Sequence, residues 1–270
     1  MTSTVKYFQQ TYPFKFSISY IEIDADSPEN VYDDHIHDEC EIYINLSGDI
    51  SFSVEGSVYP IMPGGVIITR PYEYHHCLYH SNKLHKHFWI LFDPKGNERL
   101  FDIFFKRKPG RNNLLILPPD KAEELFSVCR EMNRDGSSEA ESYYLFFKMI
   151  HMLNTADTAS AEENTKNDAV TTAINYINNN LSQKLEVKDI AKKCSVSVNT
   201  LERRFLCSLN ITPSRYIKQK RLANAERLLS EGSNVTEAAL MSGFSDCSAF
   251  IAEFKKATGL TPLKYKNRRL

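Results

Sequence analysis

The chain has 270 residues, of which 42% are hydrophobic and 25% are charged, a composition that excludes wholesale disorder. It contains no run of about 18 apolar residues, and its first residues, MTSTVKYFQQ, lack the layout of a signal peptide, so we expect no membrane segment and no export. None of the six cysteines lies in a CxxC pair, which favours reduced thiols in a cytoplasmic protein.

Charge is divided unequally along the chain, although the net charge is only −1. Residues 1–163 hold 15 Lys and Arg against 25 Asp and Glu, a net of −10, whereas residues 164–270 hold 18 against 9, a net of +9. Opposite charges on the two halves indicate two domains with different partners, and a basic domain of this size is a candidate to bind nucleic acid. A solvated charged surface would give the same totals.

Short β-strands are expected from about Phe14 to Phe92. Runs such as EIYINL, SFSV and HFWILF are rich in β-branched and aromatic residues and are separated by Gly and Pro, which predicts a sandwich or barrel. Two amphipathic helices are expected within residues 119–153. The apolar stripe of the second, with Tyr144 and Phe147, exceeds what a small barrel needs to cover, so we predict a homodimer contact there.

The composition changes again after these helices. Residues 155–168, TADTASAEENTKND, are small, polar and aperiodic, and they predict an interdomain linker. Everything after the linker has the apolar period of helices. The predicted fold class is therefore α+β in two domains, with a β-barrel and its helices in residues 1–154 and an all-α domain in residues 169–270.

The basic half contains an internal repeat. The segment VKDIAKKCSVSVNTLERRF, residues 187–205, aligns with VTEAALMSGFSDCSAFIAEF, residues 235–254, and each is followed by a Thr-Pro pair. Each unit predicts a helix, a turn and a second helix, with Ser197 and Ser245 as N-caps. A helix-turn-helix places its second helix in a DNA major groove. A plain bundle with two similar hairpins is the alternative, and two matching units in a basic domain favour DNA binding over it.

The second helix of each unit, over about residues 198–209 and 247–258, carries the candidate DNA contacts. Arginine can bond guanine through two hydrogen bonds, asparagine can pair with adenine, and lysines contact phosphates. The candidates are Ser197, Asn199, Thr200, Arg203, Arg204, Cys247, Ser248, Lys255 and Lys256. Because the repeat places Ala252 opposite Arg203, we expect the first helix to supply most of the base discrimination.

Residues 170–270 resemble the DNA-binding domain of AraC/XylS-type transcription regulators. The resemblance rests on VTEAALMSGFSDCSAFIAEFKKATGLTPLKYK, whose GFSD, FKK and TP elements form a pattern highly specific to that family. It implies two helix-turn-helix units joined by a long helix, here Pro213 to Ser230. It also implies that both outward helices enter successive major grooves of double-stranded promoter DNA, with RNA polymerase as a further candidate partner.

The acidic half resembles the two motifs of the cupin β-barrel, which AraC-type regulators often carry as a sensor domain. The matching residues are His35, His37, Glu41, Gly48, Gly65, Pro71 and His76, and Glu73 departs from the usual glycine. In metal-binding cupins the counterparts of His35, His37, Glu41 and His76 hold a divalent metal.

Regulator cupins often keep such histidines without a metal, so we expect no metal and no cofactor. We expect instead a small-molecule effector in the barrel, the usual place for a ligand in this fold. The candidate effector residues are His37, Tyr43, Arg70 and Trp89.

Two functions fit these features. The first is a transcription regulator controlled by a small-molecule effector, in which the acidic domain senses and dimerises and the basic domain binds DNA. The alternative is a metal-dependent cupin enzyme with a helical appendage. The tandem helix-turn-helix favours the regulator, because such an enzyme has no need of it. We therefore predict a regulator and no enzymatic activity.

Overall fold

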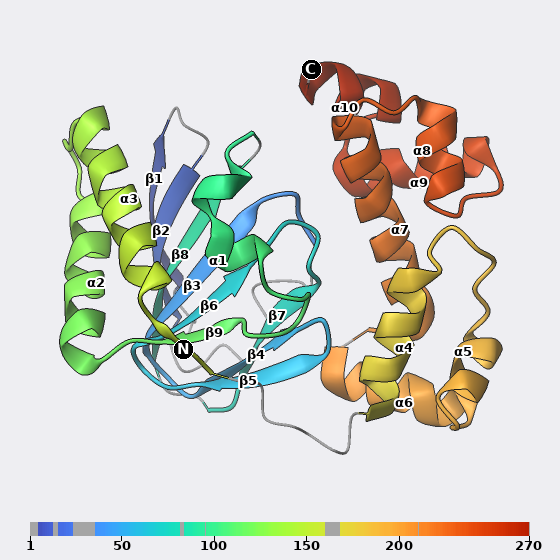
Figure 1. Ribbon diagram of the computed structural model, residues 1–270, viewed down its shortest axis with the longest axis horizontal. Helices are drawn as coiled ribbons and strands as arrows, with labels where there is room; N and C mark the ends of the chain where they lie inside the picture. Colours follow the sequence, from blue (N-terminus) through green and yellow to red (C-terminus); the bar gives the residue numbers. More distant parts are fainter. Residues whose placement is uncertain are drawn as a thin grey trace. The chain divides into compact units, whose positions relative to one another are not determined.

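The computed structural model describes residues 5–12, 16–23, 36–81, 84–94, 96–159, 168–209 and 211–269 (Figure 1). The chain divides into two compact units. The first contains the residues up to Glu163 except Ile36–Asp38, and the second contains these three residues together with Asn164–Leu270. None of the described helices combines the length and the apolar character that crossing a membrane requires.

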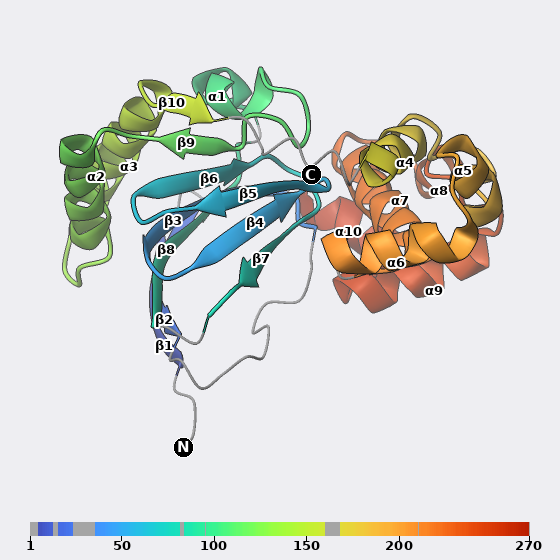
Figure 2. The ribbon, with the colours of Figure 1, turned by 90° about the horizontal axis from the view of Figure 1, so that it is seen from below.

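Two antiparallel sheets form the body of the first unit (Figure 2). In the described part of the chain, the larger sheet has the strand order β1-β2-β8-β3-β6-β9-β10 and the smaller sheet the order β5-β4-β7. The strands of the larger sheet are β1 (Val5–Tyr12), β2 (Phe16–Ile23), β3 (Cys40–Ser47), β6 (Gly65–Thr69), β8 (His85–Phe92), β9 (Leu114–Ile116) and β10 (Asp157–Ala159). Those of the smaller sheet are β4 (Ile50–Val54), β5 (Ser57–Ile61) and β7 (His75–Tyr79).

Alternation along β3 lets one strand serve two faces of the larger sheet. Ile42 and Ile44 belong to the apolar core shared with the helices, whereas Tyr43 belongs to a second core with residues of the smaller sheet such as Phe52. Because successive side chains of a strand point to opposite faces, Glu41 lies on the same face as Tyr43. The space between the two sheets is therefore lined by alternate residues of β3.

Helices cover the other face of the larger sheet (Figure 1). They are α1 (Asp102–Phe105), α2 (Pro119–Met132) and α3 (Glu139–Asn154), preceded by a 3-10 turn, η1 (Glu98–Leu100). Ile150 of α3 is buried in this core, as its apolar period predicts, but Tyr144 and Phe147 are 65% and 39% exposed. The aromatic part of the predicted stripe thus stays on the surface of the unit.

Part of the interval expected as a linker, residues 155–168, is a β-strand. Asp157–Ala159 forms β10, which pairs with β9 at the edge of the larger sheet. Residues 160–167 lie outside the described residues. A three-residue edge strand is held by backbone hydrogen bonds, so its small and polar side chains give little sign of it in the sequence.

The second unit is helical throughout its described length from residue 168 onward, apart from the connections between the helices (Figure 1). Its helices are α4 (Asp168–Asn179), α5 (Val187–Lys193), α6 (Val198–Leu209), α7 (Pro213–Ser230), α8 (Val235–Met241), α9 (Cys247–Thr258) and α10 (Pro262–Arg269). The predicted ranges of the two outward helices, α6 and α9, and of the long helix α7 are confirmed. The apolar stripe of α7 is buried and consists of Ile217, Leu222, Ala225, Leu228 and Leu229.

Side-chain caps explain where these helices begin. The hydroxyl of Ser197 accepts a hydrogen bond from the backbone N–H of Thr200, as predicted, and the hydroxyl of Thr212 accepts one from the backbone N–H of Arg215. The predicted cap of α9, Ser245, is wrong by one residue. The cap is Asp246, whose Oδ1 accepts hydrogen bonds from the backbone N–H groups of Ser248 at 2.7 Å and Ala249 at 3.1 Å. A carboxylate also complements the positive end of the helix dipole.

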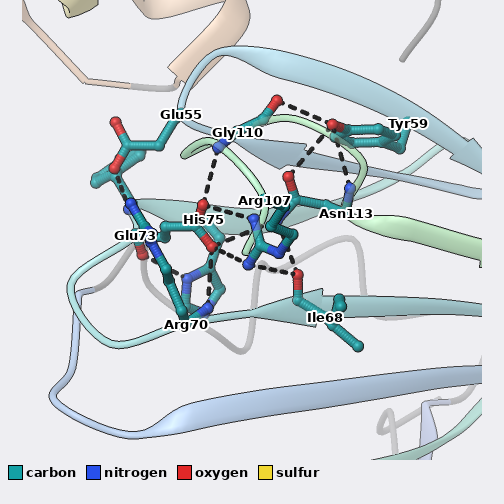
Figure 3. A network of polar contacts seen from close by, with 10 residues as sticks. Glu55, Tyr59, Ile68, Arg70, Glu73, His75, Arg107, Gly110 and Asn113 are labelled. Atoms are coloured by element: carbon teal, nitrogen blue, oxygen red, sulfur yellow. Dashed lines mark hydrogen bonds and ion pairs between the residues drawn. The ribbon is translucent and has the colours of Figure 1, made fainter. Parts of the chain in front are cut away.

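A buried ion pair joins the β6–β7 connection to the segment before β9 (Figure 3). Nη1 of Arg107 donates to Oε1 of Glu73 at 2.8 Å, and the two side chains are 5% and 2% exposed. Glu73 also accepts the backbone N–H groups of Arg70 and Gly110. Burial alone would raise the pKa of Glu73, but Arg107 and these donors hold it below its usual value. The residue that departs from the cupin motif therefore anchors the segment around Gly110.

Replacing Arg107 by Ala should lower the free energy of unfolding of the first unit by about 3–5 kcal/mol, because a buried carboxylate loses its counter-charge. Trp89, the single tryptophan, reports on this unit by fluorescence during urea denaturation. Because the pKa of Glu73 is lowered on folding, the pair stabilises at neutral pH, and this contribution should be lost as the pH falls through the acidic range.

Arg111→Ala provides the matched control, since it removes an exposed arginine from the same segment. It should change the free energy of unfolding by no more than about 0.5 kcal/mol. Equal stability of the two variants would contradict a stabilising role for the ion pair.

Candidate functional site

An aromatic pocket lies between the two sheets of the first unit. It holds about 360 Å³ of space free of protein atoms, part of it open to solvent. Its lining comes from β3, β4, β7 and β8, and consists of Glu41, Tyr43, Phe52, His75, His76, Cys77, Tyr79, His87 and Trp89. An aromatic lining with a few polar groups is typical of sites that bind small molecules.

Strand register brings the aromatic walls together. Tyr43 lies opposite Trp89 in the β3–β8 pair, and Phe52 lies opposite Cys77 in the β4–β7 pair. Directly opposed residues project from the same face of a sheet, so each pair contributes two neighbouring side chains to the pocket. The Tyr43 ring also stacks on the His87 ring, with 4.4 Å between the centroids, and tilts against Phe52 at 5.1 Å.

One end of the pocket carries a buried ion pair. Nε2 of His75 lies 3.1 Å from Oε2 of Glu41, and Nδ1 lies 2.8 Å from the carbonyl oxygen of Glu73. Both partners are acceptors, and an imidazolium, which donates from both ring nitrogens, satisfies both contacts. Burial alone would lower the pKa of His75, but the Glu41 carboxylate and these hydrogen bonds raise it above its usual value.

His87 has the opposite character. Burial lowers the pKa of His87 to about 3, so this imidazole is neutral at physiological pH. Its Nδ1 is buried and has no hydrogen-bond partner among the residues that the structure describes. A buried polar atom without a partner is costly, and a ligand in the pocket would be able to supply one.

The pocket contains two of the four predicted effector residues, Tyr43 and Trp89. Arg70 is half-buried just after β6 and is not part of the lining, while its backbone N–H bonds Glu73. His37 lies in Ile36–Asp38, the segment that groups with the second unit. The effector candidates did not include five further lining residues, Phe52, His75, Cys77, Tyr79 and His87. The spacing of two between His75, Cys77 and Tyr79 along β7 was a usable signal for three of them.

The alternative metal set does not form the site that its cupin spacing suggests. His35 lies outside the described residues, and His75 rather than His76 contacts Glu41. A histidine binds a metal through a ring nitrogen that carries no proton, whereas both ring nitrogens of His75 face acceptors. The His75 ring nitrogen that faces Glu41 would have to be free of its proton for this pair to hold a metal.

The outward faces of α6 and α9 form the second candidate site. The buried side of these helices holds Leu201, Phe205, Phe250 and Phe254. Seven of the nine predicted DNA contacts are exposed, namely Ser197, Asn199, Arg203, Cys247, Ser248, Lys255 and Lys256. Thr200 and Arg204 are half-buried, and the hydroxyl of Ser197 also bonds that of Thr200 at 2.8 Å. Both helices thus present polar and basic side chains on one face and bury the other.

Two family profiles match the chain. Residues 18–146 match the AraC-like ligand binding domain, and residues 190–268 match a helix-turn-helix domain. The chain belongs to the AraC family of transcription regulators. The predicted family, fold class and function are confirmed: the protein binds DNA through its helical domain under the control of a ligand-binding domain, and it is a regulator, not an enzyme.

Full-length relatives in the family are distant in sequence. The chain is 24% identical to the HTH-type transcriptional activator RhaS of Klebsiella pneumoniae over 282 residues, with 95% of each chain covered. It is 25% identical to the uncharacterized HTH-type transcriptional regulator YdeC of Bacillus subtilis, with 86% of this chain and 85% of the relative covered. A solved AraC-type regulator from Chromobacterium violaceum is 28% identical, covers 39% of this chain and 95% of its own, and has a TM-score of 0.37.

Proposed function

We propose that the pocket between the two sheets is the effector site and that α6 and α9 are the surfaces that contact promoter DNA. In this proposal the residues up to the end of β10 sense the effector and dimerise, residues 160–167 connect the domains, and residues 168–270 bind DNA. The observation that carries it is the pairing of an aromatic pocket in the acidic unit with two exposed basic helix faces in the unit whose net charge is +9.

The lining favours a ligand without strong negative charge. It contains no Lys or Arg among its described members, and its charged pair, Glu41 and His75, is already neutralised internally. Tyr43 and Trp89 offer flat apolar surface, and the neutral His87 offers an unpaired Nδ1. These features together suit a small neutral molecule that stacks on an aromatic wall and carries a hydrogen-bonding group.

His87→Ala should weaken effector binding about tenfold or more, because the ligand loses a stacking surface and a buried hydrogen bond. The measurement begins with a panel of small neutral molecules added to the full-length protein. Bound molecules are identified by a change in the fluorescence of Trp89, which lies in the pocket.

Arg70→Ala is the control, because Arg70 lies five residues before the pocket residue His75 in the sequence but does not line the pocket. It should leave the affinity unchanged. A bound molecule whose affinity falls in Arg70→Ala and not in His87→Ala would place the effector elsewhere.

The two outward helices are proposed to contribute unequally to DNA recognition. Arg203 is exposed on α6 and has a guanidinium that can bond the O6 and N7 atoms of guanine. Its counterpart on α9, Ala252, is also exposed but cannot donate to a base. The lysines near the end of α9, Lys255 and Lys256, are suited to phosphate contacts, which position the protein without reading sequence.

Arg203→Ala should cost about 1–3 kcal/mol at the best site and relax the preference at one or two base pairs. Lys255→Ala should weaken binding to all sequences alike and reduce the salt slope by about one. To measure both effects, the full-length protein first selects duplexes from a random pool. The affinity of each variant is then measured for the selected duplex and for every single base substitution in it. If substitutions under α9 prove as harmful as those under α6, the unequal contribution is wrong.

Three further partners and settings belong to the same proposal. The exposed Tyr144 and Phe147 of α3 support a homodimer, because large apolar side chains gathered on a surface mark interaction sites.

RNA polymerase is proposed as a partner because relatives are named transcriptional activators. All six cysteines are free thiols, which favours the cytoplasm as the place of action.

A further inference from the structure

Within the second unit, Arg221 of α7 reaches the loop between α4 and α5. Its Nε donates to the carbonyl oxygen of Leu181 at 3.1 Å, and its Nη2 donates to the carbonyl oxygen of Gln183 at 2.7 Å. Carbonyl groups just beyond the end of a helix lack partners within that helix. One guanidinium therefore fixes the backbone of the segment that leads into the first helix-turn-helix, α5–α6.

The turn of the second helix-turn-helix packs at the same place. Gly243 lies between α8 and α9 with φ of +81°, a conformation that side chains other than glycine rarely adopt. A Cβ atom on Gly243 would lie 2.1 Å from the carbonyl oxygen of Leu181 and 2.8 Å from Nε of Arg221. The bare backbone of this turn thus contacts both the loop of the first half and the arginine that holds that loop.

A second side chain of α7, Asn224, bonds the end of α8 where this turn begins. Nδ2 of Asn224 donates to the hydroxyl of Ser242 at 3.1 Å, and Ser242 is fully buried. Residues three apart on a helix share one face, so Arg221 and Asn224 project side by side. One face of α7 is therefore bonded to the first half through Arg221 and to the second half through Asn224.

We infer that Arg221, Asn224 and Gly243 form a clamp that fixes the separation and rotation of α6 and α9, and that this clamp makes the protein select DNA sites by the spacing of their two contacted segments. The inference rests on the proposed contacts of both helices with DNA. Each inserted base pair moves the second segment by about 3.4 Å and turns it by about 35°. Two helices held rigidly cannot follow that change, whereas two loosely joined units would be able to adjust. The three clamp residues are positioning residues and need not touch DNA.

The test uses a duplex selected by the full-length wild-type protein, remade with one to three base pairs inserted or removed between the two contacted segments. We expect the wild-type affinity to fall about tenfold or more for a single inserted pair, the cost of misplacing one segment. Arg221→Ala should bind the original duplex more weakly but lose no more than about threefold on insertion. A clamp that only stabilised the fold would lower binding to every duplex alike and leave the spacing penalty unchanged.

Three variants make the result specific. Arg215→Ala removes an exposed positive charge from the same helix, so it should weaken binding at all spacings by one factor and keep the penalty. Arg221→Lys keeps a donor and should restore part of the penalty. Asn224→Ala loosens the clamp more gently and should reduce the penalty even if Arg221→Ala does not fold.

Two results would overturn the inference while leaving DNA binding intact. One is that folded Arg221→Ala shows the same spacing penalty as the wild type. If Arg221→Ala does not fold, the same result in Asn224→Ala counts instead. The other is a wild-type protein that tolerates every spacing. Failure of the full-length protein to select any duplex would instead contradict the proposed function, and with it the clamp that depends on it.

Discussion

The burial of one apolar stripe on α7 is the interaction on which the DNA-binding unit depends. At its first end, Tyr216 packs edge-on against Phe205 of α6, with 5.9 Å between the ring centroids. Toward its other end, Leu222 and Leu228 share a core with α8 and α9, including Phe250 and Phe254. Each outward helix is thus aimed by the aromatic residues that it buries beside α7, and its exposed face follows from that burial. The polar contacts of Arg221 and Asn224 then set one half against the other.

In the first unit, the alternation of side chains along the strands determines which residues face the helices and which face the pocket. One face of β3 and β8 packs against the helices, and the other face supplies Tyr43, His87 and Trp89 to the pocket. An effector in the pocket would therefore contact the strands that also support α2 and α3. Tyr144 and Phe147, the residues of the proposed dimer contact, are exposed on α3.

Much of this arrangement was predictable because its signals are local. The repeated helix-turn-helix pattern and the Thr-Pro pairs mark helix ends within a few residues, and α6, α7 and α9 have the predicted bounds. Tyr43 and Trp89 were also found. His75 and His87 were missed, and Arg70 was named although it is outside the pocket, because the lining depends on how distant strands pair. The cupin spacing pointed to His76, whereas the imidazole that meets Glu41 belongs to its neighbour in the strand.

The central claim is that a single chain places two helices in successive major grooves on one face of the DNA. Hydroxyl-radical footprinting of the full-length protein on a selected duplex tests it most directly. The account predicts, for each protein chain, two protected segments about one helical turn, or 10 base pairs, apart on one face of the duplex. In Arg203→Ala, protection should weaken more in the segment contacted by α6. A single protected segment for each chain, or two segments on opposite faces of the duplex, would contradict the account.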